Sequence, residues 1–150
     1  MNKFNLKEIV EDLIDTFLYA GKVSLELREK GLTKKIKIDN TPVSNGDIEV
    51  NRIVTKKIIE LTPNIPVISE ETSDNKSAKH LRDFWLIDPI DGTYDYINNK
   101  DEFTINAGLI INNKPEAGII FARAKKRLFY SYHQDKYFEI SNNKKKILDC

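Results

Sequence analysis

The segment Asp88–Thr93, which reads Asp-Pro-Ile-Asp-Gly-Thr, contains the residue types needed for metal-assisted phosphate chemistry. Its two carboxylates directly follow the apolar residues 84–87, which we predict to form a short buried strand. Hard divalent cations prefer oxygen ligands, and two aspartates on one tight turn can hold two such ions close together. Gly92 lets the backbone approach a phosphate, and amides at the start of a following helix can bind its oxygens. The alternative interpretation is a strand-ending turn in which Asp91 caps that helix.

Two other predicted elements also carry acidic residues at their ends. Glu70 and Glu71 follow the apolar run 66–69, and Asp47 stands at the start of a predicted helix. Taken singly, the paired glutamates are typical of a solvated loop, and Asp47 is typical of a helix N-cap. All three segments, however, could bring their acidic ends to one edge of a sheet. The sequence therefore indicates a carboxylate-rich site at such an edge.

Hydrophobic periodicity predicts helices first and strands afterwards. A helix is expected over residues 5–30, between a capping Asn5 and a terminating Gly31, and a second from 47 or 48 to about 61. The predicted strands are 34–39, 66–69, 84–87, 104–111, 116–121, 128–132 and 136–140, with a turn or link at 41–42 and loops at 71–82, 112–115 and 142–146. This order favours an α+β fold in which two helices pack on a largely antiparallel sheet. We expect a single domain over residues 1–150.

The composition argues against several classes of protein, among them nucleic-acid binders and membrane-spanning proteins. The 24 Lys+Arg and 23 Asp+Glu residues give a net charge of +1, which argues against a dedicated nucleic-acid binder. The one cysteine, Cys150, cannot form an intrachain disulfide, and no apolar stretch approaches the ~20 residues of a membrane span. His80 and His133 lack neighbouring zinc ligands in the sequence. These features favour a cytoplasmic protein.

The motifs together resemble those of the inositol monophosphatase superfamily of metal-dependent phosphatases. Glu70–Glu71 and Trp85–Thr93 (W-L-I-D-P-I-D-G-T) are similar to the acidic pair and the W-[hydrophobic]₂-D-P-[hydrophobic]-D-G-T motif of that family. Within it, the chain more closely resembles the CysQ-type 3′(2′),5′-bisphosphate nucleotidases, through Lys37–Asp47 and Glu102–Asn106. The segment Tyr94–Tyr96 departs from the Lys-Glu-Phe of that group.

The resemblance implies a two-metal site. Glu70, Asp88 and the backbone carbonyl of Ile90 would hold a first Mg²⁺. Asp88 would bridge to a second Mg²⁺, which Asp91 also binds. Two such ions can clamp the attacking and leaving oxygens of an in-line displacement.

The resemblance also implies which residues act on the water and on the phosphate. Thr93, hydrogen-bonded to Asp47, would orient and help to deprotonate the attacking water, and Glu70 counts as catalytic as well as a metal ligand. Gly92 and Thr93, together with Asp91, would bind the substrate phosphate.

A resemblance that extends over roughly residues 5–140 implies a Mg²⁺-dependent phosphomonoesterase. Its implied substrate is 3′-phosphoadenosine 5′-phosphate, from which it would remove the 3′-phosphate; an inositol monophosphatase is the alternative. An interpretation of a different class is a truncated, non-catalytic remnant that at most binds metal. The expected partner is a small phosphomonoester, without nucleic acid, and the resemblance allows peripheral association with the inner membrane.

The resemblance further implies that residues 1–150 are the N-terminal half of such a phosphatase. The C-terminal α/β half of the family, with its W-D-x-A-A motif, has no counterpart in the sequence. We therefore expect an exposed apolar surface or strand edge, and either self-association or a complementing C-terminal half.

Overall fold

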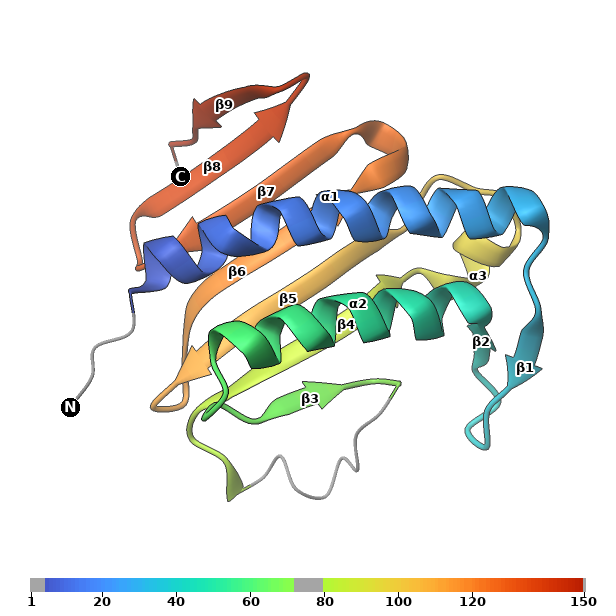
Figure 1. Cartoon of the computed structure of the whole chain (residues 1–150), viewed down its shortest axis with the longest axis horizontal. Helices are drawn as coiled ribbons and strands as arrows, with labels where there is room; N and C mark the ends of the chain where they lie inside the picture. The colour runs from blue at the N-terminus through green and yellow to red at the C-terminus, as the bar shows by residue number, and fades with distance from the viewer. Residues whose placement is uncertain (1–4, 72–79, 150) are drawn as a thin grey trace.

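Two long helices cover one face of a seven-stranded sheet in the computed structural model, which describes residues 5–71 and 80–149 (Figure 1). In chain order the elements are α1 (Leu6–Lys30), β1 (Lys34–Ile36), β2 (Pro42–Ser44), α2 (Asn45–Leu61), β3 (Val67–Ser69), β4 (Phe84–Asp91), α3 (Thr93–Ile97), β5 (Thr104–Ile111), β6 (Lys114–Ala122), the 3₁₀ turn η2 (Arg123–Lys125), β7 (Arg127–Tyr132), β8 (Lys136–Ser141) and β9 (Lys144–Ile147). The large sheet has the order β3-β4-β5-β6-β7-β8-β9, and only β3 and β4 run parallel. This arrangement confirms the predicted α+β fold.

Helix α1 forms where the periodicity predicts it. Its inward positions, among them Val10, Leu13 and Phe17, are fully buried against the sheet and α2. The side chain of Asn5 accepts a hydrogen bond from the backbone N–H of Glu8 at 3.1 Å, which satisfies a donor left free at the helix start. Gly31, with φ of +95°, ends the helix.

Helix α2 begins at Asn45, two or three residues earlier than the sequence predicts. Ser44 is the N-cap, and Asp47 occupies the third helical position. The two side chains form a capping box: Ser44 Oγ accepts from the Asp47 N–H at 3.3 Å, and Asp47 Oδ2 accepts from the Ser44 N–H at 2.9 Å. The prediction that Asp47 itself caps the helix is therefore wrong. The helix ends at Leu61, as expected.

The first strand is shorter than predicted, because the chain turns at residues 38–40. Asp39 Oδ1 accepts hydrogen bonds from the Thr41 N–H (3.0 Å) and hydroxyl (2.6 Å), and Asn40 takes a φ of 66°. The strand expected over 34–39 therefore stops at Ile36, and the link after it returns as β2, antiparallel to β1.

The basic segment 142–146 is not the loop that the sequence predicts. Asn142 and Asn143 both take positive φ and form a tight turn, a conformation that asparagine tolerates well. The following residues, Lys144–Ile147, then pair with β8 as strand β9.

The core lies between the two helices and the inner face of the sheet. Trp85, on β4, is completely buried there, and its indole N–H donates to Thr62 Oγ1 at 3.0 Å. The opposite face of the sheet bears a groove of about 540 Å³ that extends from Leu86 to Tyr137 across Gly108 and Gly118. Leu86 and Ile120 on that face are 50% and 45% exposed. Within the described residues, no helix is packed over this groove.

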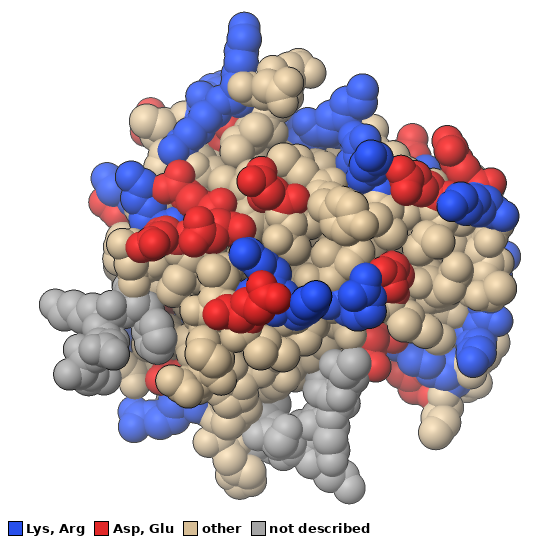
Figure 2. Space-filling model, in the orientation of Figure 1, with Lys and Arg blue, Asp and Glu red and all other residues tan. Residues whose placement is uncertain are grey.

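On the helix side, acidic and basic residues are interspersed, and neither sign forms a continuous field (Figure 2). Several of these charges pair locally, as in the ion pair between Arg52 and Glu49 on α2. Among residues 5–71 and 80–149, no helix has the length and apolar character needed to cross a membrane.

Candidate metal and phosphate site

Segments distant in the sequence meet at one side of the molecule, where β3 and β4 end and where α2 and α3 begin (Figure 1). Because β3 and β4 are parallel, with Ser69 opposite Ile87, the residues that follow them emerge side by side. The Glu70 N–H donates to the Ile87 carbonyl at 3.3 Å, which fixes Glu70 beside Asp88. The pocket here has a volume of about 530 Å³ and is lined by Lys37, Asp39, Thr41, Pro42, Ile68, Glu70, Glu71, Leu86, Asp88, Ile90, Asp91, Gly92, Thr93 and Tyr94.

Strand β4 continues through the motif, although the sequence predicts that it stops at Asp88. Its pairing with β5 shifts register between Asp88 and Asp91, because the proline between them has no N–H to donate. In a regular strand, side chains three residues apart point to opposite faces of the sheet. The irregularity breaks this alternation, and both Asp88 and Asp91 line the pocket. Gly92 follows with φ of +89°, and a Cβ there would lie 2.6 Å from the Glu102 carbonyl, so this turn requires glycine.

Asp47 lies behind this turn and is fully buried. Its Oδ1 accepts a hydrogen bond from the Thr93 hydroxyl at 2.8 Å. Its Oδ2 accepts from the Ser44 hydroxyl at 2.5 Å and from the Ser44 N–H. The Thr93 hydroxyl also lies 3.1 Å from the Ile90 carbonyl, but it has a single proton and donates to one acceptor at a time.

The carboxylates around Asp88 disfavour one another's ionised forms. Burial raises the pKa of Asp88 from 3.8 to about 7, helped by the negative charges of Glu70, Asp91, Asp47 and Glu71. Within the described residues, no three of these groups are already gathered in the geometry of a metal site. A bound cation would offset the repulsion among these carboxylates, and their oxygen donors fit a hard divalent ion such as Mg²⁺.

Lys37 and Glu71 form an ion pair across the pocket that the sequence does not predict. The Lys37 ammonium lies 3.5 Å from the carboxylate of Glu71, whose side chain is only 9% exposed. Burial raises the pKa of Glu71, and the charge of Lys37 opposes that rise. The pair ties the tip of the first hairpin to the end of β3. Lys37 belongs to a motif quoted above, but nothing in that motif identifies Glu71 as its partner.

Helix α3 is held in place by Tyr96, which is fully buried. The Tyr96 hydroxyl donates to the Ser24 carbonyl on α1 at 2.6 Å, and its ring meets Phe103 edge to face at 4.9 Å. A Cβ on Gly46 would lie 2.2 Å from the Tyr96 hydroxyl oxygen, so the start of α2 also approaches this ring. Tyr96 thereby sets the distance between the helix that carries Asp47 and the turn that carries Thr93.

The model of the inositol monophosphatase family matches residues 5–146. The chain belongs to this family. It is 36% identical over 114 residues to the 3′(2′),5′-bisphosphate nucleotidase CysQ of Haemophilus influenzae, a match that covers 75% of this chain and 42% of that protein. The predicted family resemblance is thus confirmed.

Solved structures of the family have the same fold as this chain. CysQ of Bacteroides thetaiotaomicron superposes with a TM-score of 0.68 at 27% identity, over 94% of this chain and 51% of that one. An IMPase/NADP phosphatase described as complexed with Mg²⁺ and phosphate superposes with a TM-score of 0.76 at 19% identity, over 91% of this chain and 52% of that one. The chain spans about half the length of the curated relatives it matches.

Proposed function

We propose that this chain provides the metal- and water-binding part of a Mg²⁺-dependent phosphomonoesterase. The observation that carries the proposal is that the carboxylates at the ends of β3 and β4 share a pocket with Thr93, whose hydroxyl donates to the buried Asp47. A metal-loaded carboxylate cluster next to a hydroxyl–carboxylate pair is suited to directing a water at phosphorus.

Glu70, Asp88 and the carbonyl of Ile90 are the proposed ligands of one Mg²⁺, and Asp88 and Asp91 are those of a second. All four residues line one pocket and offer oxygen atoms, the ligands that Mg²⁺ prefers, which supports this assignment. When bound, the ions supply Lewis-acid activation of a water and neutralise charge on the phosphate. The backbone amides of Gly92 and Thr93 are the proposed phosphate donors, with Asp91 alongside.

The proposed proton path uses the chain's own residues. Because Thr93 Oγ1 donates to Asp47 Oδ1, its lone pairs can accept a hydrogen bond from a water and aim that water at phosphorus. As the water oxygen bonds to phosphorus, its proton passes to Thr93 Oγ1, and the threonine proton passes to Asp47 Oδ1. The bond from phosphorus to the ester oxygen breaks, and the alcohol takes a proton from solvent. The two donors of Ser44 hold Oδ2, which keeps Oδ1 directed at Thr93.

The proposed substrate is 3′-phosphoadenosine 5′-phosphate, which loses its 3′-phosphate. The support is the similarity to CysQ proteins, which are named 3′(2′),5′-bisphosphate nucleotidases. An inositol monophosphatase remains the second candidate, because the family model itself carries that description. The rival of another class is a chain that binds metal without turnover. Since the relatives are about twice as long, we also propose that a complementing C-terminal half, or a second copy, completes the second ion's ligands.

Phosphate release across a Mg²⁺ titration tests the proposal, with 3′-phosphoadenosine 5′-phosphate and inositol 1-phosphate assayed in parallel. We expect Mg²⁺-dependent release from the nucleotide that Asp88→Asn abolishes. Asp135→Asn, at an aspartate that is 74% exposed in the β7–β8 turn, is the control and should leave release unchanged. Preferential release from inositol 1-phosphate would favour the second candidate. Metal binding without release from either compound would favour the non-catalytic rival.

A further inference from the structure

Tyr94 is an aromatic residue at the rim of the carboxylate pocket for which the proposed reaction has no use. Its side chain is 68% exposed and contributes to the lining of the pocket. Its hydroxyl makes no hydrogen bond, and its ring makes no aromatic contact, to any of the residues that the structure describes. Tyr96, two positions later, is instead fully buried with its hydroxyl bonded. The chain thus holds one tyrosine of α3 in the core and leaves the other in the solvent.

The backbone that carries Tyr94 is nevertheless well fixed. The Tyr94 carbonyl accepts hydrogen bonds from the N–H of Asn98 at 3.1 Å and from its side-chain amide at 2.8 Å. Two residues on, Tyr96 anchors the same helix to α1. Tyr94 also directly follows Thr93, the residue proposed to face the phosphate. The backbone that carries the ring is therefore fixed at the rim of the pocket, one residue from the proposed phosphate site.

We propose that Tyr94 is a stacking platform for the heterocyclic base of a nucleotide substrate, an inference that rests on the proposed function. Bases present a flat π-face to an aromatic side chain, and each such contact strengthens binding by about 1–3 kcal/mol, or about 5- to 150-fold. A saturated polyol ring such as inositol has no π-face and gains nothing comparable. Tyr94 would thereby favour a nucleotide over phosphomonoesters that lack a base.

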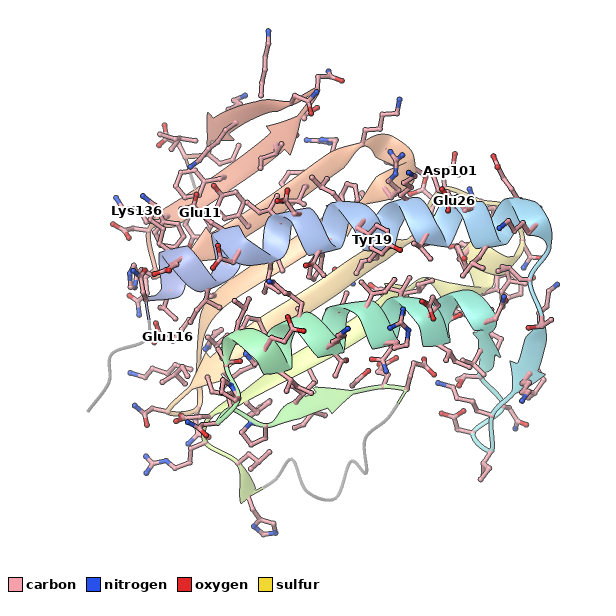
Figure 3. All side chains as sticks on the ribbon, viewed as in Figure 1. Glu11, Tyr19, Glu26, Asp101, Glu116 and Lys136 are labelled. Carbon is pink, nitrogen blue, oxygen red and sulfur yellow. The ribbon has the colours of Figure 1, made fainter. Side chains whose placement is uncertain are left out.

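Calorimetric titration in Mg²⁺ with two matched ligands tests the platform. Adenosine 3′-monophosphate and ribose 3-phosphate carry the same phosphate and sugar, with the phosphate at the position that the proposed reaction attacks, and only the first has a base. We expect the intact chain to bind the nucleotide about 5- to 150-fold more tightly. Tyr94→Ala should abolish this preference, whereas Tyr94→Phe, which keeps the ring, should retain most of it. Tyr19→Ala is the matched control, because Tyr19 is 57% exposed, lies on α1 (Figure 3) and does not line the carboxylate pocket.

The outcomes separate this inference from the function on which it rests. Equal affinities for the two ligands in the intact chain, or a preference that survives Tyr94→Ala, would overturn the platform and leave the phosphate site standing. An equal loss of both ligands in Tyr94→Ala would also overturn it, because that result marks a structural role. If ribose 3-phosphate and the nucleotide both fail to bind in a Mg²⁺-dependent manner, the proposed function falls and the platform falls with it.

Discussion

Replacing Asp88 by asparagine should make the metal-free chain more stable at alkaline pH, although the same change abolishes the proposed metal site. A carboxyl with a pKa of about 7 in the folded chain and 3.8 in the unfolded chain opposes folding by about 4 kcal/mol once fully ionised. Asp88 is only partly buried, so solvent screening should reduce this penalty to roughly 2 kcal/mol. Asparagine has nearly the same shape and carries no charge, so it removes the penalty.

The sign of the pH dependence follows from the direction of the shift. The folded chain holds the Asp88 proton more tightly than the unfolded chain, so the contribution of Asp88 to the free energy of unfolding is highest below about pH 4. It then falls as the pH rises through about 7. Urea unfolding in EDTA at pH 4 and pH 8 measures this change. We expect the difference in stability between the natural chain and Asp88→Asn to move by about 2 kcal/mol in favour of the variant.

Adding Mg²⁺ at pH 8 should make the natural chain more stable than Asp88→Asn. A bound cation stabilises the natural chain, whereas the variant lacks one of the proposed ligands of that cation. Asp135→Asn, at an exposed turn, should change stability by less than about 0.5 kcal/mol at either pH. The reasoning is refuted if the two chains show the same pH dependence in EDTA, since the carboxylate would then carry no ionisation penalty.

Three further predictions concern the supports of the site. Ser44→Ala should cost about 2 kcal/mol in urea unfolding and Asn5→Ala about 1, because both remove an N-cap but only the serine also bonds a buried carboxylate; equal losses would contradict this. Lys37→Met should raise the pKa of Glu71 further, because burial already raises this pKa and the Lys37 ammonium opposes the rise. A carboxyl ¹³C NMR titration measures the pKa of Glu71 in both chains, and an unchanged pKa would contradict the prediction. Gly46→Ala should cost about 1–3 kcal/mol in thermal or urea unfolding, because its Cβ would displace the buried tyrosine ring of α3; unchanged stability would count against that contact.

Much of the fold could be predicted from the sequence because its long elements carry strong periodicity. Helix α1 and the strands from β5 to β8 follow directly from the spacing of apolar residues. The sequence did not predict the start of α2 or strand β9, because hydrogen bonds and backbone conformations of single residues determine both. The side chain of Ser44 accepts a hydrogen bond from the N–H of Asp47, the third residue of α2, and so starts the helix earlier. Two asparagines with positive φ let the chain return as β9. Such contacts depend on single side chains, which periodicity does not describe.

The meeting of the acidic segments could be anticipated because each ends an element, and the parallel pairing of β3 with β4 sends Glu70 and Asp88 to one edge. The ion pair between Lys37 and Glu71 could not, because it joins a hairpin tip to a strand end far away in the sequence. Nor did the pattern reveal Tyr96 as the contact that spaces Asp47 from Thr93. These contacts form only when the elements pack together, so the spacing of apolar residues does not reveal them.

The position of Trp85 gives the molecule a built-in optical reporter. It is the only tryptophan in the chain, and its register partners are Val67 on β3 and Leu109 on β5. A buried indole emits at shorter wavelength than one in water, so its emission shifts to the red when these three strands separate. The signal follows the strands whose ends carry Glu70 and Asp88, while the distant pair β8 and β9 can fray without changing it. One unlabelled fluorescence measurement therefore follows the assembly of the carboxylate edge itself.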